Sequence, residues 1–214
     1  MEIRKVVINE NDILDDIVRI HNETFRGFFL TFMGSGFLRT MYSAYCSHGD
    51  SGLLIAVDET GRTVGFLAYS ENMSGLYRYM IKKKLPAFAW YSLGAFFRKP
   101  KVFTRLIRAF LKPSESERGE GYMRLASIGV EPSAKAVGVG SGLIDRLKEM
   151  TDFEKNVYIT LETDADNNEG SNSFYRKNGF LQARDYVTRE GRRMYEYRYY
   201  GKDSDGNKTT EDAV

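Results

Sequence analysis

The sequence predicts a mixed α/β fold built on a central, largely antiparallel sheet. Short β-branched or aromatic runs alternate with longer stretches whose apolar residues recur at helical spacing. Two pairs of strand-like runs are separated by short glycine-containing turns, which is typical of antiparallel hairpins. The predicted order is strand, helix, helix, two strands, an insertion, then strand, helix, strand, helix and two strands. That order favours a mixed sheet flanked by helices.

The first third of the chain predicts one strand, two helices and a hairpin. Apolar residues at steps of three and four predict a helix that follows the first strand, with Asn11 or Asp12 as its cap. Its apolar positions are Ile13, Leu14, Ile17, Val18, His21 and Phe25. Gly34 and Gly36 then break the pattern. The first strand is predicted at 3–8, the second helix at 37–46, and the hairpin strands at 53–57 and 64–69.

The second half predicts four strands and two helices. A helix at 139–150 has four apolar residues on one face, and a shorter helix at 168–178 ends at Gly179, a common C-terminal stop. The strands are predicted at 122–130, 157–161, 180–186 and 194–200, and the last two form a hairpin. The polar tail 201–214 lacks aromatic residues and is predicted to be disordered.

Length and composition set the class of protein. A chain of 214 residues fits one domain, predicted at 1–200. The single cysteine, Cys46, forms no internal disulfide, and the N-terminus lacks the apolar core of a secretory signal. The 13-residue apolar stretch 85–97 is shorter than the ~20 residues that a bilayer span needs. We therefore expect a cytoplasmic protein.

The segment 71–119 differs in composition from the rest of the chain and is predicted to be a helical insertion of two or three helices, broken at Pro86 and Pro100. Residues 72–114 contain no acidic residue, which leaves 21 basic and 29 acidic residues elsewhere. The insertion also contains nine aromatic residues. Its ten basic residues are Arg78, Lys82, Lys83, Lys84, Arg98, Lys99, Lys101, Arg105, Arg108 and Lys112.

A glycine-rich loop joins the predicted strand 122–130 to the helix at 139–150. Glycines let the backbone approach a ligand closely, and the free N–H groups at a helix start attract anions. The loop is therefore a candidate pyrophosphate site. One alternative is a tight turn without a ligand, because an isolated Gly-x-Gly is a weak signal. Another is a dinucleotide-binding loop, with Glu162 near the position of a ribose-binding acid.

The dinucleotide alternative fits poorly. Leu143 occupies the position of the third glycine, and seven residues separate Val130 from Gly138. A P-loop is excluded because no Gly-Lys-Ser/Thr follows at the needed spacing. The segment resembles instead the acyl-CoA-binding motif of the GNAT superfamily of N-acetyltransferases, strand-x-Pro-x-x-(Arg/Gln)-x-x-Gly-x-(Gly/Ala). Gly138 and Gly140 match, while Lys135 replaces the usual Arg or Gln and Ala136 a common Gly.

A second motif lies downstream. GNAT proteins often contain Asn-x-x-Ala-x-x-(Phe/Leu)-Tyr-x-x-x-Gly-Phe after their fifth strand. This chain has Asn168, Ser171 in place of Ala, Phe174, Tyr175, Gly179 and Phe180 at these positions. The resemblance covers about 1–70 and 120–200 and implies a GNAT fold, with a helical insertion between strands 3 and 4.

The resemblance also implies a site for acetyl-CoA or another acyl-CoA, which supplies an acyl group for direct attack by an amine. No nucleophile on the protein and no metal is expected. The implied cofactor-binding residues are Ser127, Ile128, Gly129, Val130, Lys135, Ala136, Val137, Gly138, Val139, Gly140, Ser141, Asn168 and Phe174.

Two residues are the catalytic candidates. Tyr175 occupies the position of the family's general acid, and a phenol with a reference pKa near 10 can protonate a leaving thiolate. The general base is less well defined, because the predicted strand 122–130 contains no acidic residue. Glu162 is the first candidate. Asp164, Glu23 and His21 are further ones, as is a water chain.

The basic, aromatic insertion suggests an anionic small-molecule acceptor, such as a nucleotide-linked or lipid-linked amino sugar. Peripheral membrane contact, an acidic acyl carrier protein as donor, and a plain helical cap are alternatives. Nucleic-acid binding is not expected, because the net charge of +2 is low and no readout motif appears. A non-catalytic module that binds CoA or a partner stays open, as does a homodimer.

Overall fold

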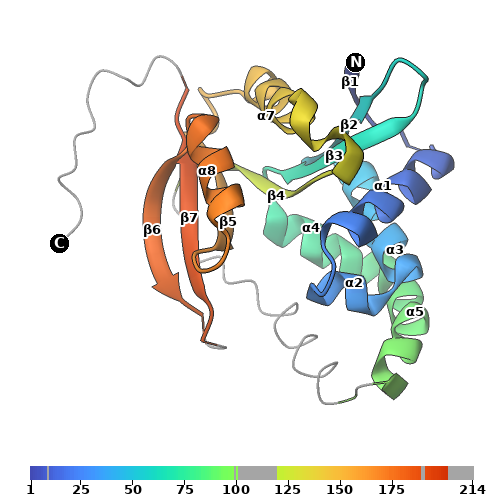
Figure 1. Cartoon of the computed structure of the whole chain (residues 1–214). Coiled ribbons are helices and arrows are strands. Elements are labelled where there is room, and N and C mark those ends of the chain that lie inside the picture. The colour runs from blue at the N-terminus through green and yellow to red at the C-terminus, as the bar shows by residue number, and fades with distance from the viewer. Residues whose placement is uncertain (9, 99, 101–119, 189–190, 202–214) are drawn as a thin grey trace.

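The computed structural model describes residues 1–8, 10–98, 100, 120–188 and 191–201. Its centre is a seven-stranded sheet in the order β1-β2-β3-β4-β5-β7-β6 (Figure 1). Every pair of neighbouring strands is antiparallel except β4 and β5. The predicted mixed, mostly antiparallel class is therefore confirmed. The predicted disorder of 201–214 lies almost wholly outside the described residues.

Six of the seven strands lie close to their predicted positions, and β4 has the predicted bounds. The first strand is shorter than predicted, because after Lys5 the chain turns toward the first helix. The strands are β1 (Glu2–Lys5), β2 (Ser51–Val57), β3 (Thr63–Ser70), β4 (Tyr122–Val130), β5 (Tyr158–Asp164), β6 (Leu181–Val187) and β7 (Arg193–Tyr199).

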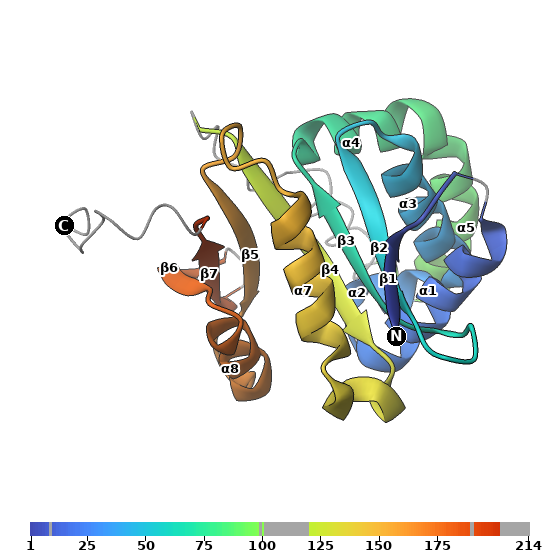
Figure 2. The same cartoon turned by 90° about the horizontal axis from the view of Figure 1, so that it is seen from above.

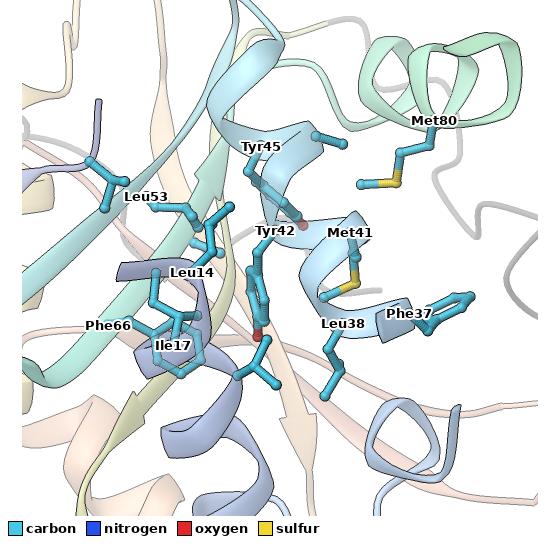
Figure 3. Packing of buried hydrophobic residues seen from close by; sticks show 14 of the residues in the cluster. Leu14, Ile17, Phe37, Leu38, Met41, Tyr42, Tyr45, Leu53, Phe66 and Met80 are labelled. Carbon is cyan, nitrogen blue, oxygen red and sulfur yellow. The ribbon is translucent and has the colours of Figure 1, made fainter. Parts of the chain in front are cut away.

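Helices α1 (Asn11–Thr24), α2 (Phe29–Met33) and α3 (Ser35–Ser47) cover one face of the β1–β4 half. Their apolar sides enclose a core with the strands, in which Tyr42 reaches from α3 toward Ile17 and Phe66 (Figure 3). The short helix α2 was not predicted. The predicted cap of α1 was wrong, because Glu10 takes the N-cap position and its carboxylate binds Arg4 at 2.7 Å and the Val7 N–H at 2.7 Å.

The insertion begins as one continuous helical run on the same face. It comprises α4 (Met73–Tyr79), a π-helical turn η1 (Met80–Lys84) and α5 (Leu85–Arg98). The predicted break at Pro86 was wrong. Proline lacks an N–H and clashes with the carbonyl four residues earlier, but the wider π turn just before it changes that geometry. The predicted break at Pro100 borders residues outside the described ranges.

Helices α7 (Val139–Met150) and α8 (Glu169–Lys177) lie on the opposite face. The α7 bounds are those predicted from its apolar spacing, and Gly179 ends α8 with a φ of 78°. Leu143 and Leu147 are fully buried over β2, β3 and β4, while Tyr175 and Phe180 extend this second core over β5 and β7. The sheet thus separates two hydrophobic cores.

Strands β4 and β5 are paired only at their beginnings. The parallel pairs run from Tyr122–Tyr158 to Arg124–Thr160, and there they end. Beyond them, β4 pairs only with β3, and β5 only with β7. A bulge in β4 at Ala126 follows directly. Figure 2 shows the two strands diverging, so the sheet opens into a V at its centre.

One polar network is buried on the α1 side of this V. His21 Nδ1 lies 2.7 Å from the Tyr42 hydroxyl, which also hydrogen-bonds the Ser127 side chain of β4. Nε2 of His21 is buried without a partner among the described residues. Burial lowers the pKa of His21 to about 4. The imidazole therefore stays neutral in the folded state at neutral pH, which makes it a poor acceptor for a substrate proton.

We predict that His21 makes the fold sensitive to acid. Its pKa falls from 6.5 in the unfolded chain to about 4 in the folded one, so the unfolded state binds the proton first. Stability should be unaffected above pH 6.5 and should fall as the pH drops toward 4, by about 1.4 kcal/mol per unit and about 3 kcal/mol in total. His21→Gln should reduce this slope in thermal melts.

His48→Gln is the matched control, since it removes the other histidine, which is half-exposed and bound to Ser51. It should keep the wild-type dependence on pH. An unchanged slope in His21→Gln would contradict the assignment.

Candidate active site

The backbone of β4 provides hydrogen-bonding groups inside the V. The Glu131 N–H donates to the Val64 carbonyl at 2.8 Å, and the register pairs Gly129 with Phe66. Because groups alternate along an antiparallel strand, the N–H and C=O groups of Ile128 and Val130 point away from β3. They face the side from which β5 has separated. An extended ligand in the V would meet these groups as a neighbouring strand does.

The glycine-rich loop lies at the wide end of the V. It comprises a 3₁₀ helix η2 (Pro132–Val137), which contains Lys135, Ala136 and Val137, followed by Gly138 and α7. Gly138 has a φ of 79°, a left-handed conformation that favours glycine, and a Cβ there would meet nothing within 4 Å. No side chain caps α7, and its first turn has no acidic residue.

The start of α7 therefore leaves N–H groups without helical partners. Gly142 N–H is bonded to the Gly138 carbonyl, whereas the N–H groups of Val139, Gly140 and Ser141 precede the first helical bond. Together with the positive end of the helix dipole, they form an anion site. The space beside Gly138 is open, so a pyrophosphate can lie next to these N–H groups.

An ion-pair cluster anchors this loop. Glu131, whose side chain is 12% exposed, binds Arg19 of α1 and Arg62 of the β2–β3 turn at 2.7 Å each. The Ser133 hydroxyl donates to the same carboxylate at 3.2 Å. Glu131 was not identifiable from the sequence, because its partners are far away in the chain. Its adjacency to Pro132 at the strand end was the one available signal.

Helix α8 faces the loop across the V. A Cβ built on Gly140 would lie 3.0 Å from the Phe174 ring and 3.7 Å from Val130, so these three predicted residues converge. Asn168, at the N-cap of α8, donates from Nδ2 to Thr163 Oγ1 at 2.7 Å and to the Asp164 carbonyl at 3.1 Å. In this structure it joins α8 to the end of β5.

Tyr175 is 9% exposed and packs against Phe174, Phe180 and Tyr197, with ring centroids 5.4 to 6.1 Å away. Its hydroxyl makes no hydrogen bond to another described residue. Burial raises the pKa of Tyr175 to about 12. The phenol is therefore protonated across the physiological range, as a general acid must be.

Glu162 lies on the other face of β5. Side chains alternate between the two faces along a strand. Leu161 therefore points to the α7 and α8 core, and Glu162 points to the α1 side with Arg124. Arg124 binds Glu162 at 3.0 Å, and the Tyr186 hydroxyl donates to it. Burial alone would raise the pKa of Glu162, but Arg124 and Tyr186 outweigh it and lower that pKa. The carboxylate is thus ionised at neutral pH.

The other base candidates have fixed partners. Asp164 binds Arg192 through both oxygens at 2.7 and 2.8 Å. Glu23 lies 3.7 Å from Arg19. Ser127, which was predicted as a cofactor-binding residue, has its side chain hydrogen-bonded to Tyr42. Within the ranges described, no group of three or more metal-ligating side chains comes together, and no helix is long and apolar enough to cross a membrane.

A hollow of about 280 Å³ opens between the α1–α2 and β6–β7 connections. Phe25, which directly precedes Arg26 in the chain, contacts Gly129 of β4. Arg192, which lines the hollow, binds Asp164 at the end of β5. The hollow therefore lies beside the wide end of the V on the α1 side. The hollow could not be found from the sequence, because its sides come from loops that are far apart in the chain. Its lining residues are Arg26, Gly27, Phe28 and Arg192.

Solved structures share this fold. Naa20 of Chaetomium thermophilum in complex with a bisubstrate analogue aligns with a TM-score of 0.59 at 16% identity, covering 99% of this chain and 93% of that one. A ribosomal-protein-alanine N-acetyltransferase from Brucella melitensis aligns with a TM-score of 0.58 at 16% identity, covering 94% of this chain and 99% of that one. NAA60 of Arabidopsis thaliana in complex with acetyl-CoA aligns with 0.55 at 14%, covering 93% and 97%.

At these identities the likeness shows the fold alone, and no curated protein matches the sequence significantly. The acetyltransferase (GNAT) family profile matches residues 14–180, which is most of the chain and includes both motifs. Because the match also spans the opened strands and the loop at their wide end, the chain belongs to the acetyltransferase (GNAT) family, with acetyl-CoA as its cofactor.

Proposed function

We propose that the protein is an N-acetyltransferase whose acceptor is an anionic small molecule with an amine. The observation that carries the acceptor class is the hollow with Arg26 and Arg192 at the wide end of the V. Arg26 is exposed and forms no ion pair with any described residue. Guanidinium groups bind phosphate and carboxylate well, so an acidic group of the acceptor would bind here.

When bound, acetyl-CoA supplies an activated acetyl group to the acceptor nitrogen. The N–H groups at the start of α7 hold its pyrophosphate, and Glu131 keeps the loop in place. The N–H and C=O groups of Ile128 and the N–H of Val130, which point away from β3, would pair with its extended arm. One of these two N–H groups serves as the donor to the carbonyl oxygen, where negative charge develops.

Tyr175 and Glu162 move the protons in this proposal. Tyr175, on the α8 side, donates a proton to the departing thiolate. Glu162, ionised on the α1 side, attracts the acceptor ammonium and takes its first proton directly or through a water. As the C–N bond forms and the C–S bond breaks, the nitrogen loses its second proton to water, and Tyr175 regains its proton from solvent. The two residues lie on opposite faces of the sheet, so they meet only at the open V. Each face then brings one substrate to the reacting atoms.

A nucleotide-linked amino sugar fits this hollow best, since it combines an amine with phosphate. A lipid-linked amino sugar is the second candidate, favoured by the basic, aromatic insertion. The alternatives from the sequence, a non-catalytic module and a donor carried by an acyl carrier protein, lack a specific observation in the fold. A cytoplasmic location stays a prediction from the sequence.

We predict that Gly138→Glu weakens acetyl-CoA binding by about tenfold or more, because it brings negative charge to the anion site. Isothermal titration calorimetry measures this directly. Gly61→Glu is the control, since Gly61 has a φ of 81°, also faces open space, and lies in the β2–β3 turn. Equal losses in both variants would mean that backbone strain, rather than phosphate contact, explains the result.

We predict that Tyr175→Phe and Glu162→Gln each lower kcat by about 10² or more, with different pH profiles. The Tyr175 pKa of about 12 and the lowered Glu162 pKa keep acid and base in the active form from about pH 6 to about pH 10. Without Glu162, the rate should rise only as the acceptor ammonium loses its proton to solvent, so the pH profile of the variant should shift to alkaline pH.

Thiol release with a panel of amino sugars provides the assay for these variants. Tyr195→Phe and Glu169→Gln are matched controls on β7 and the first turn of α8. Wild-type rates in Glu162→Gln at neutral pH would remove Glu162 from the mechanism and favour a water chain.

We predict that Arg26→Ala raises KM for a nucleotide-linked amino sugar by about tenfold, the effect of losing one charge-assisted hydrogen bond. The KM for a neutral amino sugar should change little. Arg146→Ala on α7 is the control, because it removes an exposed arginine away from the hollow. Equal effects on charged and neutral acceptors would contradict an anion-binding role.

A further inference from the structure

Helix α5 packs on the protein through one side only. On that side Phe88 is buried against Phe37, with ring centroids 4.8 Å apart, and Ser92 is buried as well. The Tyr91 ring lies against Gly36 at the start of α3, although much of it remains exposed. These contacts fix α5 on α2 and α3 at the edge of the molecule (Figure 1).

The opposite side of α5 is apolar and exposed. Trp90 is 71% exposed and Phe97 is 77% exposed, and the exposed Leu93 lies between them on the same side at helical spacing. A surface helix normally presents polar residues to water there. We call Trp90, Leu93 and Phe97 the outer face of α5. A contiguous exposed face of large apolar residues indicates a partner.

Positive charge flanks this face. Lys82 and Lys83 are exposed in the π-helical turn directly before Leu85. Residues 72–114 contain no acidic side chain that could neutralise them along the sequence. The partner must therefore accept apolar side chains and carry negative charge at the same place.

An anionic membrane surface meets both requirements. Tryptophan, phenylalanine and leucine side chains enter the boundary between headgroups and acyl chains, while lysines beside them bind anionic headgroups. The helix is short and remains attached to α2 and α3, so it would lie along the surface without crossing it.

We propose that the outer face of α5 docks the protein on anionic membranes. The hollow with Arg26 precedes α2, and α2 contacts α5, so docking holds the acceptor entrance close to the bilayer. Docking itself does not require the proposed acetyl transfer. The two can therefore fail separately.

Trp90 is the only tryptophan in the chain, so its fluorescence reports this helix alone. With vesicles of phosphatidylcholine and phosphatidylglycerol, emission should shift to the blue, and the protein should co-sediment with them. Pure phosphatidylcholine vesicles should bind about tenfold or more weakly, and raised salt should release the protein.

Two variants separate the apolar and charged contributions. Leu93→Ser with Phe97→Ser should abolish co-sedimentation, and Lys82→Glu with Lys83→Glu should lower vesicle affinity about tenfold or more. Leu181→Ser is the matched control, since Leu181 is 64% exposed on β6 and should not matter. Acetyl-CoA binding by calorimetry should remain unchanged in all three variants, which confirms that they fold.

Two results would overturn the proposal. One is an unchanged emission spectrum with anionic vesicles. The other is a blue-shifted Trp90 emission without lipid, together with a dimer in analytical ultracentrifugation without lipid. This dimer would be absent in the Leu93 and Phe97 variant. That outcome would assign the outer face to a second copy of this chain.

Discussion

The end of pairing between β4 and β5 at Arg124 and Thr160 is the constraint on which the site depends. A continuous sheet would satisfy all backbone groups of β4 and would leave no passage between its faces. Because the strands part, the N–H and C=O of Ile128 and the N–H of Val130 have no strand partner, while the Val130 carbonyl accepts from the Thr24 hydroxyl at 3.2 Å. The same opening lets residues from opposite faces act on one pair of reacting atoms.

The two halves of the molecule are held around this opening by different forces. Two hydrophobic cores, one on each face, fix α1–α3 and α7 on the β1–β4 half, and the second core also fixes α8 on β5 and β7. Ion pairs fix the loops at the wide end, with Glu131 binding Arg19 and Arg62 and Asp164 binding Arg192. Apolar burial thus stabilises the scaffold, and charged groups position the parts that contact substrates.

Burial and pairing also assign the protonation states near the V. Tyr175 stays neutral because apolar rings surround it, whereas Glu162 stays ionised because Arg124 and Tyr186 stabilise its charge. Burial keeps His21 neutral, and its imidazole packs in the core with a hydrogen bond to Tyr42. The same residue types would behave differently on an exposed surface, so sequence position alone does not define their chemistry.

The sequence by itself determined the seven strands, most of the helices and the two motifs, because these follow from local spacing. The α7 bounds, the β4 bounds and the stop at Gly179 follow from apolar periodicity and glycine. Three features were not predictable: the π turn that absorbs Pro86, the Glu131 anchor, and the hollow with Arg26 and Arg192. The Glu131 anchor and the hollow join residues far apart in the chain, and the π turn, although local, has no apolar or glycine signal that predicts it. Only the tertiary structure decides such contacts, since they follow from the packing of whole elements.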